Sequence, residues 1–217
     1  MDSCQVDSLP SGQLPSGRSP MSGVLIAFEG LDQSGKETQA RLLGERLTAA
    51  GRRVQIVSFP DYTTSIGGEL HRALHGEHDY GADVIQLLMI ANRYEWKAAI
   101  AAALARGEVV IADRYLASSV AYGEAQGLDP AWLREAQRYL PVPSATLMID
   151  IAPATAVARK RVNRDRFEQD LELLERVRAS YRRQATAAGW HAIDGERPIA
   201  DVAVSVAEVI EPVLAQR

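Results

Sequence analysis

Apolar residues are concentrated in five short runs, which are separated by longer segments of helical character. The runs cover residues 24–28, 54–59, 108–112, 146–151 and, more weakly, 190–193. They are rich in Val and Ile and do not alternate polar with apolar side chains, which is typical of strands buried on both faces of a parallel sheet. The helical segments between them favour right-handed β–α–β crossovers. The pattern therefore predicts an α/β fold, a five-stranded parallel sheet flanked by helices on both faces.

Apolar side chains between the runs recur at helical spacing. Residues 83–105 form the longest such segment, and a helix is expected to open at Phe167-Glu168. The expected buried faces are formed by Ala40, Leu43, Leu47 and Ala50, by Leu171, Leu174, Val177, Tyr181 and Ala185, and by Val202, Val206, Val209 and Val213. We expect the last of these helices to cover the sheet.

The composition narrows the class of protein. The 217 residues are 47% hydrophobic, which suits one globular domain with a real core. A net charge of −4 argues against a dedicated nucleic-acid binder, and no apolar segment reaches membrane-spanning length without charge. Cys4 is the single cysteine, so neither an internal disulfide nor a cysteine metal cluster is expected. We therefore expect a protein of the reducing cytoplasm with no nucleic-acid or membrane partner.

Residues 1–20 differ in composition from the rest of the chain. Ser, Pro and Gly dominate, Leu-Pro-Ser-Gly occurs twice, and the segment lacks the basic start and apolar core of a signal peptide. We predict a disordered tail over 1–20 and a single domain over 21–217. Met21 directly precedes the first strand and is a candidate start of translation.

A glycine-containing loop lies between the first strand and the first helix, and its spacing from Gly30 to Gly35-Lys36 fits a P-loop. In such loops, backbone N–H groups and the helix N-terminus hold phosphate oxygens, and the lysine reaches the transferring phosphate. Glu37 stands where Ser or Thr usually follows the lysine. The alternative that this glycine loop binds no ligand therefore remains open. The predicted ATP-binding residues are Gly30, Gln33, Ser34, Gly35, Lys36, Glu37 and Thr38.

Two further strands end in polar residues, at 59–62 (Phe-Pro-Asp-Tyr) and at 113–115 (Asp-Arg-Tyr). Ligands of parallel sheets bind at the carboxyl ends of the strands, so we expect both segments to join the P-loop. Asp113 is placed to bind magnesium or its waters, and Arg114 to hold a phosphate with two parallel hydrogen bonds. The alternative for Asp113 is a cap of the helix that begins near Leu116.

Three other polar groups allow two interpretations each. Residues 92–94 (Asn-Arg-Tyr) lie in an apolar helical segment, where composition alone favours a solvated face over a substrate contact. His71, His75 and His78 are interpreted as surface residues, because no carboxylate or cysteine pattern completes a zinc site. Five of the eight residues 159–166 are basic, which fits either a solvated helix end or a lid that brings arginines to phosphates.

Taken together, these motifs resemble the thymidylate kinase family of nucleoside monophosphate kinases, over roughly residues 21–215. The segment 28–38 resembles the family's P-loop, and 113–122 is similar to its DRY segment ending in Ser-x-x-Ala-Tyr. Phe59-Pro60 matches the monophosphate-binding turn and Asn92-Arg93 the base-binding arginine. The residues Asp165, Arg166, Phe167 and Glu168 match a DRFE-like segment at the lid.

The resemblance implies a P-loop NTPase fold with a short lid over about 159–167. It also implies Mg²⁺-dependent transfer of a phosphoryl group from ATP to dTMP, giving ADP and dTDP in dTTP biosynthesis. Magnesium would be held through Asp113 and Thr38. Because Gln33-Ser34 offers no arginine, the catalytic arginine would come from the lid. The implied catalytic residues are Lys36, Asp113, Arg114, Arg161 and Arg164.

For the acceptor, the resemblance implies that Asp32 accepts from the 3′-hydroxyl and that Arg93 hydrogen-bonds a pyrimidine carbonyl. Tyr122 would stack beneath the deoxyribose and exclude a 2′-hydroxyl by sterics. The implied dTMP-binding residues are Asp32, Phe59, Pro60, Tyr62, Met89, Arg93, Arg114, Ser118, Ser119, Tyr122, Asp165, Phe167 and Glu168.

The resemblance further implies a homodimer packed through helices, with residues 83–105 at the interface. Met89 occupies a position where the family commonly has an aromatic, which leaves open a kinase for another pyrimidine monophosphate such as dUMP. Glu37 leaves open a non-catalytic nucleotide-binding module, since a carboxylate beside phosphates weakens ATP binding unless it points away. A regulatory P-loop switch lacks support, because no guanine-specific Asn-Lys-x-Asp motif is present.

Overall fold

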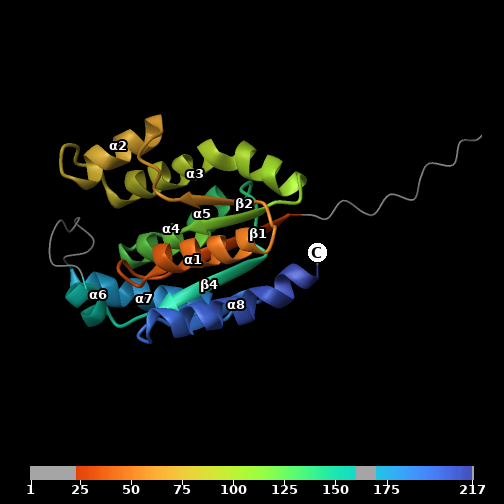
Figure 1. Ribbon diagram of the computed structural model, residues 1–217. Helices are drawn as coiled ribbons and strands as arrows, with labels where there is room; N and C mark the ends of the chain where they lie inside the picture. Colours follow the sequence, from red (N-terminus) through yellow and green to blue (C-terminus); the bar gives the residue numbers. More distant parts are fainter. Residues whose placement is uncertain (1–22, 160–169, 217) are drawn as a thin grey trace, which may run out of the picture.

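The computed structural model describes residues 23–159 and 170–216. Its strands form one parallel sheet in the order β2-β3-β1-β4-β5 (Figure 1). The central strand is β1, in which Ile26 is in register with Ile111 of β3 on one side and Ala145 of β4 on the other. The predicted α/β class and the five parallel strands are confirmed. The strands are β1 (Val24–Glu29), β2 (Val54–Ser58), β3 (Val109–Asp113), β4 (Ala145–Asp150) and β5 (Trp190–Asp194).

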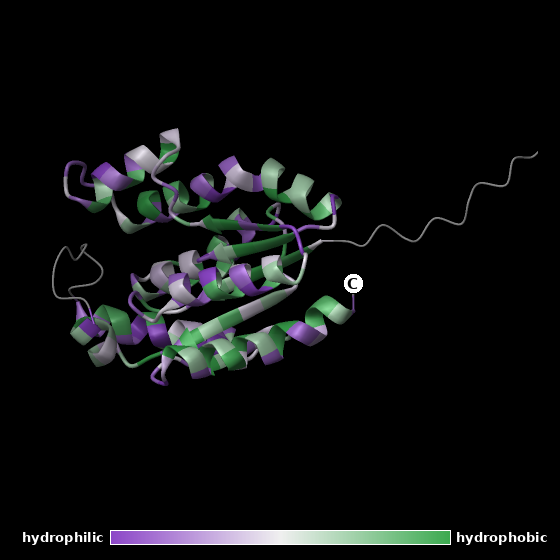
Figure 2. Cartoon of the chain, in the orientation of Figure 1, coloured by the Kyte–Doolittle hydropathy of each residue, from purple (hydrophilic) through white to green (hydrophobic). Residues whose placement is uncertain are grey.

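Helices cover both faces of the sheet. They are α1 (Lys36–Ala49), α2 (Ser65–Leu74), α3 (Ala82–Ala105), α4 (Leu116–Ala125), α5 (Pro130–Ala136), α6 (Pro153–Arg159), α7 (Leu171–Gln184) and α8 (Ile199–Ala215). In the ranges 23–159 and 170–216, no helix is long and apolar enough to cross a membrane. Figure 2 shows hydrophobic residues along the strands and a mixture of hydrophilic and hydrophobic residues along the helices.

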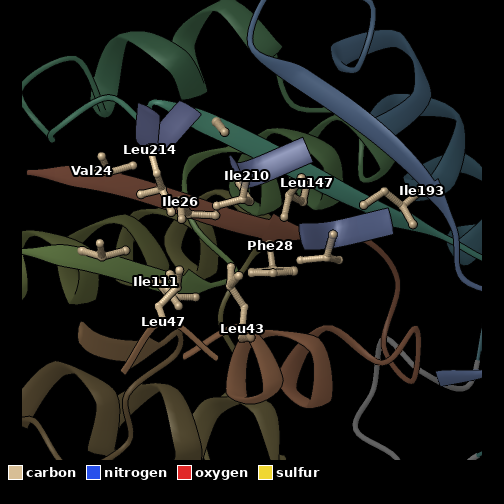
Figure 3. Packing of buried hydrophobic residues seen from close by; sticks show 14 of the residues in the cluster. Val24, Ile26, Phe28, Leu43, Leu47, Ile111, Leu147, Ile193, Ile210 and Leu214 are labelled. Carbon is tan, nitrogen blue, oxygen red and sulfur yellow. The ribbon is translucent and has the colours of Figure 1, made fainter. Parts of the chain in front are cut away.

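Side chains of β1 alternate between two different cores. Val24, Ile26 and Phe28 point to the face covered by α1 and α8, where they pack with Leu147 and Ile111 (Figure 3). The side chains between them point to the face covered by α3, α4 and α7. The alternation therefore places Glu29, the last residue of β1, on the second face.

The expectations for two of the helices need correction. The helix expected to open at Phe167-Glu168 begins at Leu171, because Asp170 is its N-cap and its carboxylate accepts from the Leu173 N–H at 3.0 Å. Leu171 is exposed rather than buried, since it lies in the first turn, and Leu173 packs inward instead. Ala50 is likewise exposed, because it follows the last residue of α1 as its C-cap.

Candidate active site

The carboxyl ends of β1, β2 and β3 meet at one end of the sheet. The backbone N–H of Phe59 donates to the Asp113 carbonyl at 2.9 Å, and that of Arg114 donates to the Phe28 carbonyl at 2.8 Å. The Arg114 guanidinium also donates to the Gly30 carbonyl at 3.1 Å. The fold thereby brings the P-loop together with the polar segments that follow β2 and β3.

Glycine is required where the P-loop leaves β1. Gly30 has a φ of 137°, and a Cβ at this position would lie 2.4 Å from the carbonyl oxygen of Ile149. Gly35 precedes α1 with a φ of 93°, and no side chain caps this helix. The first N–H groups of α1 therefore open toward the loop, which is the arrangement that binds anions at a helix N-terminus.

Lys36 is the first residue of α1 and is buried. Its ammonium group donates to the Leu31 carbonyl at 2.6 Å. Burial lowers the pKa of Lys36 to about 8 and the positive charge of Arg114 adds to the effect, while Asp32 and Asp113 oppose it. An anion in the loop would favour the charged form further, so the lysine is poised to bind phosphate.

A cavity of about 450 Å³ lies over the P-loop. Glu37 at its edge is exposed, whereas Thr38 is half-buried. Arg159 closes one side, donating to the carbonyls of Gln33 at 3.1 Å and Gly195 at 3.0 Å. The lining includes all the predicted ATP-binding residues except Gly30, and it adds Gln39, Gly195 and Arg197, which the sequence analysis did not single out.

Asp113 closes this cavity at the end of β3. One of its carboxylate oxygens, Oδ1, is buried and has no hydrogen-bond partner among the described residues. The capping alternative is wrong, because Tyr115 is the N-cap residue of α4 and the helix takes its acceptor from Glu29. An unpaired carboxylate oxygen beside a phosphate loop fits a hydrated magnesium ion, and Thr38 lines the same cavity.

A second cavity, of about 110 Å³, lies between α3 and α4. Every residue predicted to bind dTMP that the structure describes lines it. These residues are Asp32, Phe59, Pro60, Tyr62, Met89, Arg93, Arg114, Ser118, Ser119 and Tyr122, and the cavity adds Leu74 and Gln86. The two additions were missed because neither belongs to a motif.

At the P-loop end of this cavity, Arg114 donates to Asp32 Oδ1 at 2.6 Å, and the Tyr122 hydroxyl donates to Asp32 Oδ2 at 2.7 Å. Burial would raise the pKa of Asp32, but the charges of Arg114 and Lys36 outweigh it and hold that pKa well below its usual range. Arg114 has a φ of 62°, a left-handed conformation that costs free energy in a residue other than glycine. The network fixes its guanidinium between the P-loop and the cavity.

At the other end, Arg93 is 2% exposed. It donates to Ser119 Oγ at 2.8 Å and to the Met89 carbonyl at 3.0 Å, and its guanidinium lies 5.7 Å from the centre of the Phe59 ring. Burial lowers the pKa of Arg93 to about 10, which leaves it charged at neutral pH. Its Nε is buried and has no hydrogen-bond partner among the described residues.

The solvated-face interpretation of residues 92–94 is wrong. Asn92 is fully buried and fastens the turn after β2 to α3, accepting from the Asp61 N–H at 2.8 Å and donating to Thr64 Oγ1 at 2.8 Å. Tyr94 donates to the Ala136 carbonyl at 2.9 Å. Asn92 can be buried, and Tyr94 partly buried, because each finds a partner in a segment distant in the sequence.

Glu29 and Tyr181 are central to the site, although the sequence analysis assigned neither a functional role. The Glu29 carboxylate accepts from the N–H groups of Tyr115 at 2.9 Å and Ala117 at 3.1 Å, and from Ser118 Oγ at 2.7 Å. The Tyr181 hydroxyl lies 2.8 Å from Ser118 Oγ and accepts from Arg114 at 3.3 Å. A carboxylate at the end of an otherwise apolar run was the available signal for Glu29.

The histidines lie outside both cavities, as expected of surface residues. His71 and His75 are exposed, with their rings stacked 4.1 Å apart, and His78 is exposed beside Glu69. The described residues contain no group of three or more His, Cys, Asp or Glu side chains able to hold a metal. The predicted lid residues Arg161, Arg164, Asp165, Phe167 and Glu168 lie outside the described residues.

The chain is similar to known proteins over most of its length. The family model described as thymidylate kinase matches residues 28–206. The thymidylate kinase of Xanthomonas campestris pv. campestris is 37% identical over 198 residues, which is 90% of this chain and 86% of that protein. Thymidylate kinase of Homo sapiens is 32% identical over 179 residues, covering 82% and 84% of the two chains.

The fold is similar to that of a solved thymidylate kinase from Candida albicans. The TM-score is 0.76 at 27% sequence identity, and the match covers 88% of this chain and 92% of that chain. The parallel sheet with its P-loop is thus the P-loop NTPase fold of these kinases. The family model, the relatives and the structure agree, and the chain belongs to the thymidylate kinase family of nucleoside monophosphate kinases.

Proposed function

We propose that this chain transfers the γ-phosphoryl group of ATP to dTMP, giving ADP and dTDP for dTTP synthesis. The observation that carries the proposal is the meeting of two cavities. Asp32, Phe59 and Arg114 line both the cavity over the P-loop and the cavity between α3 and α4. A donor phosphate in the first and an acceptor phosphate in the second would meet at Arg114.

The described side chains account for binding and positioning. Lys36 and the N-terminus of α1 hold the donor phosphates, and Arg114 contacts both the moving phosphoryl group and the acceptor phosphate. Asp113, together with Thr38, is suited to hold hydrated Mg²⁺, which when bound neutralises charge on the donor phosphates. The predicted lid arginines, Arg161 and Arg164, would add charge to the transition state.

The acceptor cavity orders the nucleotide along its length. Arg93 and Ser119 hold the base end, Met89 packs on the base, and Tyr122 lies beneath the sugar. Asp32, fixed as an anion by Arg114, accepts from the 3′-hydroxyl. The alternatives of a dUMP kinase or a non-catalytic module are not favoured by the relatives, and Glu37 at the cavity edge is exposed to solvent.

A coupled ADP-release assay with ATP and Mg²⁺ tests the function, with dTMP, dUMP, dCMP, dGMP, AMP and UMP as acceptors. We expect the highest kcat/KM for dTMP. Absence of turnover with every acceptor, in a protein that binds ATP, would overturn the proposal and direct attention to Glu37. Activity spread evenly over pyrimidines would retain phosphoryl transfer but remove dTMP preference.

We further propose a cytoplasmic homodimer with α3 at its interface. Val84 and Leu87 on α3 are 38% and 45% exposed, and Trp132 on α5 is 37% exposed. Exposed large apolar side chains on a helix are suited to contact a second copy. Light scattering at micromolar concentration tests the assembly, and a monomer there contradicts it. Leu87→Lys should shift a dimer toward monomer, whereas Leu171→Lys, at an exposed leucine on α7, should not.

A further inference from the structure

Gln86 is a buried polar residue to which the motifs assign no role. It lies on α3, is 2% exposed and lines the acceptor cavity. Its side-chain oxygen, Oε1, is buried and has no hydrogen-bond partner among the described residues. A buried carboxamide oxygen left without a donor costs free energy, and on a residue that lines a cavity it can gain that donor from a ligand.

Gln86 shares its helix face with the base-binding arginine. Met89 and Arg93 follow it by three and seven residues, so all three project into the same cavity from α3. A Cβ added to Gly123 of α4 would lie 2.4 Å from Leu133 Cδ1 and 3.4 Å from Gln86 Cγ. Gln86 therefore packs within contact distance of α4, where Leu133 leaves room only for glycine at position 123.

The unmet hydrogen-bond needs of this cavity are complementary. Arg93 Nε is a donor without an acceptor, and Gln86 Oε1 is an acceptor without a donor. Arginine can only donate, so the ligand must offer it an acceptor. The ligand edge that meets both needs carries a carbonyl oxygen next to an N–H, as does the imide of a pyrimidine-2,4-dione.

We propose that Gln86 is a specificity-determining residue that reads the imide edge of the acceptor base, accepting a hydrogen bond from N3–H while Arg93 donates to the neighbouring carbonyl. The inference rests on the proposed function and refines it. Thymine and uracil share this edge. Cytosine would turn an amino group toward Arg93 and a bare N3 toward Gln86, so both contacts would be lost together.

Gln86→Leu tests the assignment, because it keeps the approximate size of the side chain and removes its polar atoms. We expect kcat/KM for dTMP and for dUMP to fall together, by about 10–100-fold, because each base then leaves N3–H unpaired in a dry pocket. The value for dCMP should change much less, so the ratio of dTMP to dCMP should fall about tenfold or more. The ratio of dTMP to dUMP should stay constant.

Two measurements separate a substrate contact from a structural role. Since Oε1 has no partner in the free protein, the unfolding midpoint of Gln86→Leu in urea should equal or exceed that of the parent chain, while calorimetry should show weaker dTMP binding. Gln137→Leu is the matched control. Gln137 is also buried with an unpartnered Oε1, but it lies outside the acceptor cavity and donates to the carbonyls of Leu116 and Leu133.

The control should lose stability and keep the ratio of dTMP to dCMP. The inference is overturned if Gln86→Leu keeps that ratio, or if it lowers all acceptors equally while also destabilising the fold. If the parent chain phosphorylates no pyrimidine monophosphate, the proposed function itself fails. If the parent chain prefers dTMP but Gln86→Leu leaves the ratio of dTMP to dCMP unchanged, only the role of Gln86 is contradicted.

Discussion

The two faces of the sheet are covered by different kinds of buried side chain. Beyond the first turn of α1, the buried side chains that α1 and α8 contribute to their face are apolar (Figure 3). On the opposite face, the buried groups include Glu29, Gln86, Asn92, Arg93 and Ser118. One strand, β1, supplies both, since Phe28 belongs to the first face and Glu29 to the second.

The two faces have different roles: the apolar face stabilises the fold, and the polar face positions a ligand. An apolar face is stabilised mainly by burial and tolerates substitutions that conserve its volume. A buried polar face is stable only if each group is paired, and pairing fixes side chains in one geometry. Two of the residues there that keep a buried polar atom unpaired, Gln86 and Arg93, line the acceptor cavity. We therefore expect mutations on the two faces to have different effects.

The largest effect is expected from Lys36→Met, which keeps the aliphatic stem and removes the charge. We expect kcat to fall by about 10³-fold or more, because charge neutralisation of the phosphates is lost. Denaturant unfolding at pH 7 should not weaken, because the variant no longer buries an ammonium group. Lys97→Met, at a lysine on α3 outside both cavities, is the matched control and should keep its turnover. Near-normal turnover in Lys36→Met would contradict the role of Lys36 in neutralising the phosphates.

The next effect should appear in stability alone. Leu147 is fully buried on the apolar face, and Leu147→Ala would leave a cavity that costs about 2–5 kcal/mol of unfolding free energy. Because no ligand contact is involved, kcat/KM for dTMP should stay within about threefold at temperatures where the variant is folded. Urea unfolding and the ADP-release assay measure the two quantities. A loss of activity in the folded variant would mean that the faces are coupled.

An intermediate result is expected from Glu29→Gln, which keeps the shape and removes the charge. The amide is a weaker acceptor for the N–H groups of Tyr115 and Ala117, so the unfolding free energy should fall by about 1–3 kcal/mol. Because α4 carries Ser118 and Tyr122, KM for dTMP should rise as well.

Glu124→Gln is the control for Glu29→Gln. Glu124 also lies on α4, but it is partly exposed and pairs with Arg183 at 2.8 Å, outside the acceptor cavity. Its substitution should change both stability and KM only slightly. Equal effects of the two substitutions would remove the special role of the buried carboxylate.

The apolar face was predictable from sequence, and much of the polar face was not. Buried parallel strands are local apolar runs, so the five strands were located to within two residues. The partners of Glu29 lie far away in the chain, with Ser118 89 residues and Tyr181 152 residues distant. Periodicity does not record such pairings, and it assigned the buried Asn92 and Arg93 to a solvated face.

The family motifs recovered part of what periodicity missed. They identified Arg93 and Ser119 by their place in a pattern, and the structure brings both to one cavity. Gln86 and Leu74 belong to no motif and emerged only from the packing of α2, α3 and α4. Sequence patterns therefore identified most of the residues that line the cavity. They missed residues that shape its selectivity.

The last effect that we predict is a pH dependence in which activity and stability move in opposite directions. Burial lowers the pKa of Lys36 to about 8, whereas the unfolded chain has the ordinary value of 10.5. As the pH rises above 8, the free enzyme loses the ammonium charge, and kcat/KM for ATP should fall about tenfold per pH unit.

The stability change has the opposite sign. Between pH 8 and 10.5 the unfolded chain binds the Lys36 proton and the folded chain does not, so the contribution of this residue to folding rises with pH. We expect the parent chain to gain unfolding free energy relative to Lys36→Met between pH 7.5 and 9.5, while its kcat/KM declines. Urea unfolding of both proteins at each pH measures the difference. A constant difference would show that Lys36 keeps an ordinary pKa, and that the P-loop does not hold it desolvated in readiness for phosphate.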